Sequence, residues 1–245
     1  MTTDAYRGFA ERYDAFRTDA PERRDYFESL FRAHNVRRVL DCACGTGRDL
    51  LLFETMGIGV VGSDLSGAML SRARETIEEA SKAIPLLQAD FRELPGRIDG
   101  PFDAVVCLST SLPHLHEDAA LLKALESMRG VLRDGGILVL DQGMTDRQWS
   151  ERPQFIPAVN TPELSRLMAI DYADETFTVH VLDFSGSEAE RAFHHDQFVY
   201  RRLLRDDYER LLREAGFSSI DFAGGFNGEP YKRDESRRLI VVAIR

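Results

Sequence analysis

Short apolar segments alternate with amphipathic segments between residues 36 and 141, and this alternation constrains the fold more than any other feature. Runs rich in Val, Leu and Ile have the length of strands, and the stretches between them space their apolar residues as helices do. This alternation is typical of βαβ units, so the sequence predicts a doubly wound α/β fold with a parallel sheet. The expected strands are 37–42, 59–63, 84–89, 102–108 and 136–141, and the expected helices are 48–56, 66–80 and 118–132.

The segment from 142 to 202 follows a different period. Residues 176–184 and 192–203 alternate apolar and polar side chains, as antiparallel strands with one exposed face do. The intervening SGSEAE, residues 185–190, is typical of a turn. We therefore expect an antiparallel insert after the fifth strand.

The two ends of the chain complete the expected domain. A helix is predicted at 19–35, with Asp19 as a candidate N-cap, and another at 206–215. Strands at 218–224 and 238–244 lack a crossover helix between them, so they should pair antiparallel. We expect one domain over 1–245, made of a helical flap, a cofactor-binding core, a lid insert and a final helix with two strands, at 1–35, 36–141, 142–203 and 204–245.

Composition excludes several classes of partner. A formal charge of -10 and a pI near 5.2 provide no basic field for a phosphate backbone, so nucleic acid is not the expected substrate. The longest apolar runs, such as 239–244, are far shorter than the roughly 20 residues that cross a bilayer, so no membrane partner is expected. Three cysteines and a polar start without a signal segment favour a reduced, cytoplasmic protein.

Two glycines, Gly45 and Gly47, stand between the first predicted strand and its helix. They allow a ligand to approach bare backbone, and the helix start offers free N–H groups. Cys42 and Cys44 lie beside them, but zinc sites usually need a second pair of cysteines, which this chain lacks. We expect both to be small buried residues, and no metal.

The glycine turn departs from the dinucleotide fingerprint. Leu50 stands where G-x-G-x-x-G has its third glycine, and an acidic residue, Asp41, precedes the turn. A ligand without phosphates is therefore the better match. A nicotinamide-dependent oxidoreductase is a competing class, which Leu50 and the antiparallel final strands disfavour.

The turn resembles the first motif, D-x-x-x-G-x-G, of the class I S-adenosylmethionine-dependent methyltransferases. VVGSDLSGAML, ADF, FDAVVCLSTSLPHL and LRDGGILVLD follow in the family's order. The resemblance implies a Rossmann-like seven-stranded sheet, parallel with an antiparallel last strand, and a lid insert after strand five. It implies S-adenosylmethionine as cofactor and S-adenosylhomocysteine as product, with the ribose on Asp64 and the adenine near Asp90. The cofactor-binding residues that follow from it are Asp41, Ala43, Gly45, Gly47, Asp64, Leu65, Met69, Asp90, Phe91, Cys107 and Leu108.

The acceptor is a small molecule by the same resemblance. ACGTG and the segment ending in HL are similar to glycine N-methyltransferase, and the HL and inserted strands are similar to amino-sugar N,N-dimethyltransferases. Residues 141–146 (DQGMTD) lack the asparagine that the glycine enzyme uses there. A ring nitrogen of an azapteridine of the toxoflavin type, or an oxygen of a small metabolite, stays open as acceptor, as does a catalytically silent binding protein.

The remaining site residues are predicted from position and chemistry. His114 follows the fourth strand and could accept a proton from an amine, while Tyr6 and Tyr13 lie on one aromatic face with Phe9 and Phe16. Either of Arg23 and Arg24 could bind the cofactor's carboxylate, and Arg24 is the one assigned. The candidate substrate residues are Trp149, Arg152, His195 and Tyr231. Oligomeric state is left undetermined.

Overall fold

A computed structural model describes residues 4–16, 21–186 and 191–245, with all their side chains except those of residues 16, 157, 158 and 191. The strands are β1 Arg38–Asp41, β2 Gly59–Asp64, β3 Leu86–Gln88, β4 Phe102–Cys107, β5 Leu132–Gln142, β6 Phe155–Asn160, β7 Leu164–Tyr172, β8 Thr176–Gly186, β9 Arg191–Arg201, β10 Ser219–Ala223 and β11 Leu239–Ile244. The α-helices are α1 Pro21–Ala33, α2 Arg48–Glu54, α3 Gly67–Glu79, α4 Asp118–Val131, α5 Asp146–Glu151 and α6 Arg205–Glu214. Short 3-10 helices are η1 Ala10–Phe16, η2 Phe91–Glu93 and η3 Leu112–His114. The predicted N-cap Asp19 and residues 187–190 of the predicted turn lie outside the described residues.

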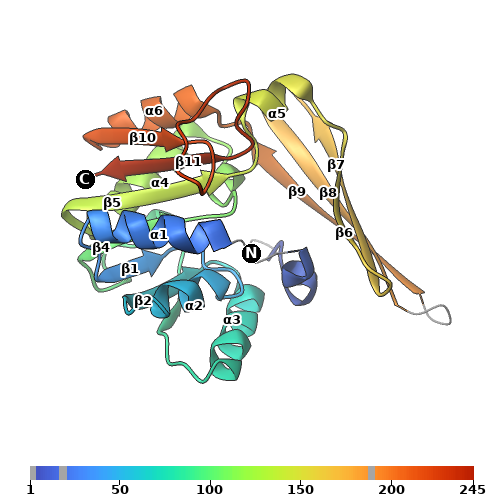
Figure 1. Cartoon of the computed structure of the whole chain (residues 1–245), viewed down its shortest axis with the longest axis horizontal. Helices are drawn as coiled ribbons and strands as arrows, with labels where there is room; N and C mark the ends of the chain where they lie inside the picture. Colours follow the sequence, from blue (N-terminus) through green and yellow to red (C-terminus); the bar gives the residue numbers. More distant parts are fainter. Residues whose placement is uncertain (1–3, 17–20, 187–190) are drawn as a thin grey trace.

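The main sheet has seven strands in the order β10-β11-β5-β4-β1-β2-β3 (Figure 1). β1 pairs parallel with both β2 and β4, and β11 runs antiparallel to β5 and β10. The strand order reverses between β1 and β4, which is where open α/β sheets bind ligands at the carboxyl ends of their strands. The predicted Rossmann-like sheet and its antiparallel strand are confirmed.

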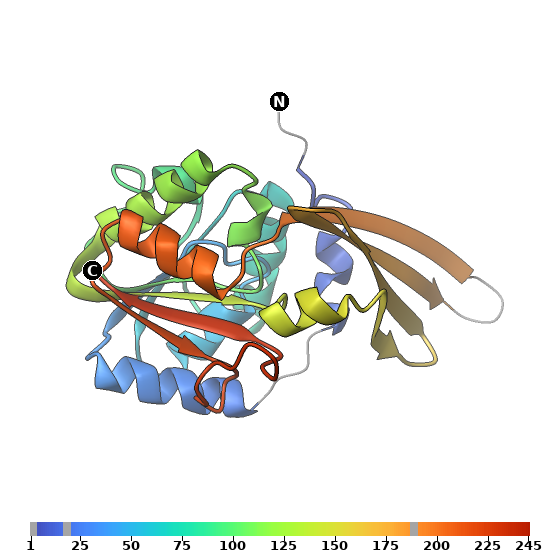
Figure 2. The ribbon, with the colours of Figure 1, turned by 90° about the horizontal axis from the view of Figure 1, so that it is seen from above.

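Helices cover both faces of this sheet, as Figure 2 shows from above. Neighbouring strand residues enter different cores: Leu40 packs with α4 and α6, and Val39 packs with α1, α2 and α3. This alternation follows from the pleat, which points successive side chains to opposite faces. Among the helices that the structure describes, none is both long and apolar enough to cross a bilayer.

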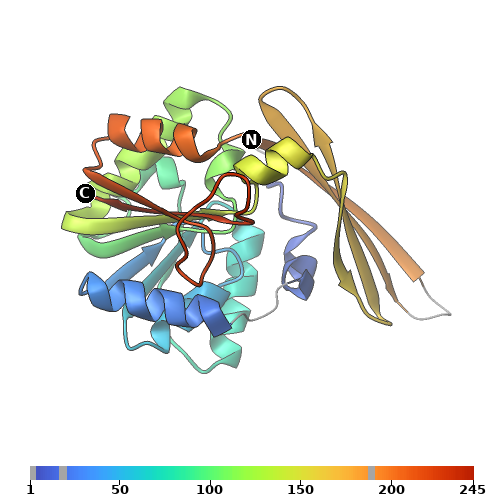
Figure 3. The same ribbon diagram turned by 45° about the horizontal axis from the view of Figure 1, so that its top comes forward.

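The insert forms a separate antiparallel sheet of four strands, β6-β7-β8-β9, which projects from the main body (Figure 3). The two predicted strands correspond to β8 and β9, which pair in register from Thr176 opposite Arg201 to Gly186 opposite Arg191. β6, β7 and α5 were not predicted from the sequence. η1 lies between the main body and the inner face of this second sheet (Figures 1 and 2).

Candidate active site

The glycine turn follows β1 and is tied to the end of β2 by a carboxylate. Asp64 Oδ2 accepts a hydrogen bond from the Gly45 N–H at 2.8 Å, and Oδ1 accepts one from the Ser66 N–H at 2.8 Å. Gly45 has a φ of +53°, in the left-handed region that favours glycine. One acidic side chain therefore connects the turn with the start of α3.

Gly47 is required by its conformation and by its neighbour. Its φ is +85°, and a Cβ added there would lie 3.2 Å from the Ala73 Cβ of α3. The close approach expected of a third glycine occurs instead on β2, because a Cβ on Gly62 would lie 2.6 Å from Leu50 Cδ1. The dinucleotide fingerprint has a glycine on the helix at this contact. Here the helix carries the large residue, Leu50, and the strand carries the glycine, Gly62.

Carboxylates dominate the electrostatics of this turn. Burial raises the pKa of Asp41 well above its ordinary value, and the charge of Asp49 raises it further. Burial also raises the pKa of Asp64, against the hydrogen bonds from Ser66 and Gly45 that lower it. Acidic side chains packed this closely favour a cationic ligand beside them. The neighbouring thiols of Cys42 and Cys44 are buried and free, and burial raises their pKa values.

The other predicted cofactor residues line or support this edge of the sheet. Leu65 follows Asp64 with 59% of its surface exposed, while Met69, Cys107 and Leu108 are buried. The Ala43 N–H donates to Asp41 Oδ1 at 3.2 Å. Phe91 packs against the core under α4.

Asp90 caps η2, so its carboxylate already has partners. It accepts from the Arg92 main-chain N–H at 2.9 Å and from the Arg92 guanidinium at 3.0 Å. Partial burial would raise the pKa of Asp90, but these bonds lower it. A contact between the Asp90 side chain and adenine stays a prediction.

Residues 4–16, here called the amino-terminal segment, lie across the glycine turn. Asp4 Oδ2 accepts from the Ser66 hydroxyl at 2.9 Å, and Asp14 Oδ1 accepts from the Thr46 hydroxyl at 2.9 Å. A Cβ added to Gly45 would lie 4.0 Å from the ring of Tyr13. The segment thus contacts both the turn and the start of α3.

The same segment brings Tyr6 to His114. The Tyr6 hydroxyl lies 2.7 Å from His114 Nε2, and the Tyr6 ring stacks on Phe198 of β9 with centroids 4.7 Å apart. Tyr13 meets Tyr6 edge-on at 6.3 Å, and the His114 ring lies 4.5 Å from Tyr200. The three residues predicted to be catalytic are therefore neighbours, although two come from the amino-terminal segment and one follows β4.

Burial controls the protonation of this group. It lowers the pKa of His114 to about 4, with a smaller contribution from His116, so the imidazole is neutral at neutral pH. Burial also raises the pKa of Tyr6 well above its ordinary value, as do the nearby Tyr200 and Tyr13. The site presents a neutral nitrogen and a neutral hydroxyl.

A strained turn connects β4 to η3. Ser109 and Thr110 have φ values of 58° and 66°, which cost free energy in residues other than glycine. Asp141, at the end of β5, holds the turn: its carboxylate accepts from the Ser109 N–H, and its carbonyl accepts from the Thr110 N–H at 3.0 Å. This turn sets the position of His114.

The two arginines of α1 point in different directions, and the assignment of the cofactor's carboxylate to Arg24 stays a prediction. Arg24 is 43% exposed and pairs with Glu28 and with Thr55 at the far end of α2. Arg23 donates to Asp49 at 3.1 and 2.8 Å and has its NH1 nitrogen 3.8 Å from Asp141. Consecutive helix residues point in directions about 100° apart, so only Arg23 reaches these carboxylates.

The predicted substrate residues are dispersed. Trp149 packs edge-on against Tyr172 at 5.5 Å, and the Arg152 guanidinium lies 4.6 Å from the Trp149 ring centre. Tyr200 and Phe177 belong to the same apolar cluster, which connects this pair indirectly with His114. Their assignment to the acceptor stays a prediction.

His195 lies on the face of the inserted sheet that points away from the amino-terminal segment, and its predicted contact with the acceptor stays a prediction. It contacts His180, with 2.9 Å between ring nitrogens, and His180 contacts Asp171. Asp196 and Phe198 face the amino-terminal segment, and side chains alternate along β9, so His195 faces away.

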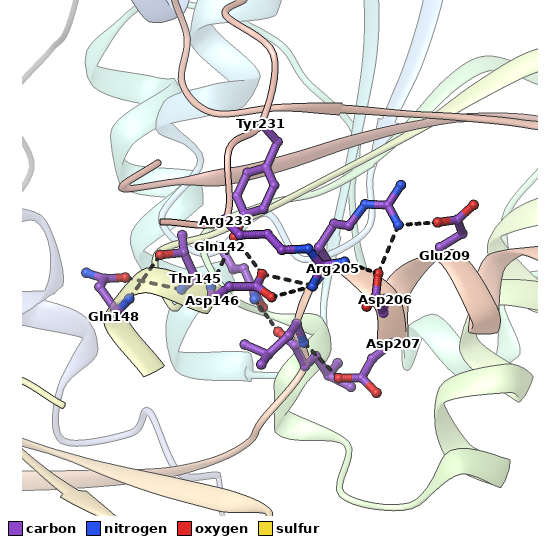
Figure 4. A network of polar contacts seen from close by, with 12 residues as sticks. Gln142, Thr145, Asp146, Gln148, Arg205, Asp206, Asp207, Glu209, Tyr231 and Arg233 are labelled. Atoms are coloured by element: carbon purple, nitrogen blue, oxygen red, sulfur yellow. Dashed lines mark hydrogen bonds and ion pairs between the residues drawn. The ribbon is translucent and has the colours of Figure 1, made fainter. Parts of the chain in front are cut away.

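The Tyr231 hydroxyl belongs to the network in Figure 4, and its predicted contact with the acceptor stays a prediction. It donates to Asp146 Oδ2 at 2.7 Å and accepts from the Asp146 N–H at 3.0 Å. Gln142, in the same network, donates to the carbonyls of Met144 and Leu203 at 2.6 Å each. Tyr231 therefore helps to fix the base of the insert.

Four residues of this site were not predicted from the sequence: Asp4, Ser66, Phe198 and Tyr200. A signal for the last two was present, since alternation in FHHDQFVY places Asp196, Phe198 and Tyr200 on one face of β9. The sequence has no corresponding signal for Asp4, which reaches Ser66 only through tertiary structure.

Comparisons with known proteins agree with this arrangement. A family model described as "Methyltransferase domain" matches residues 39–136. A methyltransferase-family protein of Bacillus subtilis (strain 168) is 32% identical over 216 residues, covering 86% of each chain. A crystal structure of an S-adenosylmethionine-dependent methyltransferase from Clostridium acetobutylicum ATCC 824 superposes with a TM-score of 0.84 at 19% identity, over 98% of both chains.

The chain belongs to the class I S-adenosylmethionine-dependent methyltransferases. Among its relatives in that class is a glycine/sarcosine N-methyltransferase of Aphanothece halophytica. It is 28% identical over 244 residues, which cover 96% of this chain and 88% of the relative.

Proposed function

We propose that this methyltransferase methylates a nitrogen atom of a small-molecule amine, with the acceptor bound between the glycine turn and the inner face of the inserted sheet. The observation that carries the proposal is the pair of neutral groups, Tyr6 and His114, held 2.7 Å apart above that turn. The N-methyltransferase named among the relatives supports nitrogen as the acceptor atom.

The residues at the turn fit S-adenosylmethionine. Asp64 offers a carboxylate at the carboxyl end of β2, where it could accept hydrogen bonds from two ribose hydroxyls. Leu65 beside it exposes an apolar side chain that suits a purine ring. The acidic surroundings of Asp41 suit a positive charge, and Arg23 suits a carboxylate. When bound, the cofactor supplies an electrophilic methyl group on a sulfonium.

The chain's own residues would then orient the acceptor and exclude water. An amine attacks only through a free lone pair, so a protonated amine must first lose a proton. The His114 Nε2 lone pair can accept the Tyr6 hydroxyl proton, which leaves the Tyr6 oxygen free to accept a hydrogen bond from an amine N–H. Phe9 and Phe198 are buried beside Tyr6 and His114 and would exclude water from them.

Calorimetry tests the cofactor site. S-adenosylhomocysteine should bind with a Kd on the order of 1 μM, about -8 kcal/mol, and NAD should not bind. Asp64→Ala should weaken the binding of S-adenosylhomocysteine at least about tenfold, because it removes both hydroxyl acceptors. Binding of NAD without S-adenosylhomocysteine would contradict the proposal.

A panel of acceptors tests the atom that receives the methyl group. Glycine, sarcosine, an amino sugar, a heteroaromatic ring nitrogen and a catechol are supplied with labelled S-adenosylmethionine, and the products are separated by mass spectrometry. We expect transfer to nitrogen, and a kcat that falls in His114→Ala more than affinity for S-adenosylhomocysteine does. Transfer only to the catechol oxygen would overturn the choice of nitrogen.

A further inference from the structure

Arg12 joins the amino-terminal segment to the inserted sheet. Its Nε donates to Asp183 Oδ2 of β8 at 3.1 Å, and its NH2 group pairs with Asp196 of β9. Its NH1 group donates to the Gly8 carbonyl at 2.7 Å, which also fixes the local shape of the segment. One guanidinium thus connects three parts of the chain.

A second arginine makes this connection a buried network. Arg166 of β7 donates to both oxygens of Asp183, at 2.5 and 2.6 Å, and to the Arg12 carbonyl at 2.8 Å. The side chains of Arg166 and Asp183 are only 2% and 0% exposed. Burial alone would raise the pKa of Asp183, but hydrogen bonds and charge from Arg166 and Arg12 lower it below its ordinary value.

The network has one member that comes from the amino-terminal segment. Removing Arg12 would leave Asp183 paired with Arg166, but Asp196 would lose the guanidinium that it shares with the segment. Buried charge pairs have strict geometry, because an uncompensated charge in the interior is costly. The position of Arg12 is therefore well defined, and with it the position of Tyr6, six residues earlier in the same segment.

We propose that Asp183 and Asp196 are positioning residues that act through Arg12, holding the amino-terminal segment across the glycine turn so that donor affinity depends on two carboxylates of the inserted sheet. The proposal rests on the proposed function. Asp14 contacts the turn, Asp4 contacts Ser66 at the start of α3, and Arg12 contacts the inserted sheet. The inserted sheet thus contributes to the donor site without touching it.

The test uses Asp196 because it is partly exposed, so that its replacement should leave the fold intact. Asp196→Asn and Arg12→Ala should each raise the Kd of S-adenosylhomocysteine on the order of tenfold. The double variant should bind no more weakly than Arg12→Ala alone, because Asp196 acts through Arg12. Asp196→Glu keeps the carboxylate and should restore affinity to within about threefold. The matched control is Asp171→Asn, on the opposite face of the same sheet, which should leave the Kd unchanged.

The outcomes separate the two proposals. If the wild type binds S-adenosylhomocysteine and Asp64→Ala does not, but Asp196→Asn and Arg12→Ala both bind as the wild type does, the positioning role is overturned and the proposed function stands. If the wild type fails to bind, both fall. A second readout is the KM for the methyl donor, which should rise in Asp196→Asn more than kcat falls, whereas a general loss of folded protein would lower the apparent kcat alone.

Discussion

At the scale of single residues, the site depends on which way each charged side chain points. Arg23 and Arg24 are neighbours in the chain. Arg23 pairs with Asp49, whereas Arg24 bonds to Thr55 at the far end of α2. Asp64 forms its bonds through both oxygens, to the turn and to the start of α3. Chemistry therefore follows orientation as much as residue type.

The two arginines provide a matched pair for testing donor recognition. Arg23→Ala should raise the Kd of S-adenosylhomocysteine about tenfold or more, because a charge-assisted bond to its carboxylate would be lost. Arg24→Ala removes the same side chain from the same helix and should change the Kd less than twofold, since an exposed pair contributes about 0–1 kcal/mol. Calorimetry measures both, and equal effects would contradict the assignment of Arg23.

His114 predicts a dependence of stability on pH. Its pKa is about 4 in the folded protein against an ordinary 6.5, so the unfolded chain binds the proton more readily between these values. Stability should therefore fall as pH falls from 6.5 to 4, by on the order of 1–3 kcal/mol from this residue. Denaturant unfolding at several pH values measures it, and His114→Gln should flatten the slope. An unchanged slope would show that His114 titrates normally.

At the scale of elements, the glycine turn works because two helices and two strands approach it closely. Gly47 lies against α3, and Gly62 of β2 lies against Leu50 of α2. Their missing side chains let α2 and α3 pack together above the carboxyl ends of β1 and β2. Because their neighbours already lie within contact distance, these positions tolerate little added volume.

Gly47→Ala tests this packing, with Gly57→Ala as its control. Both glycines have positive φ, +85° and +75°, but only Gly47 has a neighbour within 4 Å of the added Cβ. Gly57→Ala should cost about 1 kcal/mol from backbone strain alone. Gly47→Ala should cost at least about 1 kcal/mol more, because α3 must shift. Chemical denaturation compares them, and equal losses would mean that the contact with Ala73 is not tight.

At the scale of the whole molecule, the segment that enters the inserted sheet after β5 and the segment that leaves it after β9 are hydrogen-bonded to each other. Gln142 ends β5 and Leu203 follows β9, and the Gln142 amide joins them. Tyr208 of α6 donates to the same amide at 2.8 Å, and Asp146 holds Tyr231 and Arg233 nearby (Figure 4). This network fixes the direction in which the sheet leaves the main body.

Gln142→Leu should therefore destabilise the protein well beyond the loss of one side chain. It leaves the carbonyls of Met144 and Leu203 without their donor and the Tyr208 hydroxyl without its acceptor, for a loss on the order of 2–5 kcal/mol. The control is Gln88→Leu, an exposed glutamine bonded to the Leu65 carbonyl, which should cost below about 1 kcal/mol. Urea denaturation compares the two, and similar midpoints would contradict the structural role of Gln142.

The strands of the main sheet and the helices that cover it were predictable because their apolar residues recur at regular spacings. β7 was missed because its pattern is broken: buried Arg166 lies on the inner face, while Leu167 and Ala169 lie on the outer face. Arg166 can be buried there because Asp183 of β8 pairs with it, and the residues around Arg166 in the sequence give no sign of that pairing. β6 contains Pro157, which lowers the expectation of a strand.

The sequence by itself determined the parallel sheet, the glycine turn and the acidic residues at the strand ends, because each depends on short-range periodicity or on a fixed spacing along the chain. Only the tertiary structure decided that Arg23 rather than Arg24 pairs with Asp49, that His195 faces away from the amino-terminal segment, and that Tyr6 contacts His114. These choices depend on the rotation of a helix or the face of a strand relative to a distant partner, and packing between residues far apart in the chain sets both.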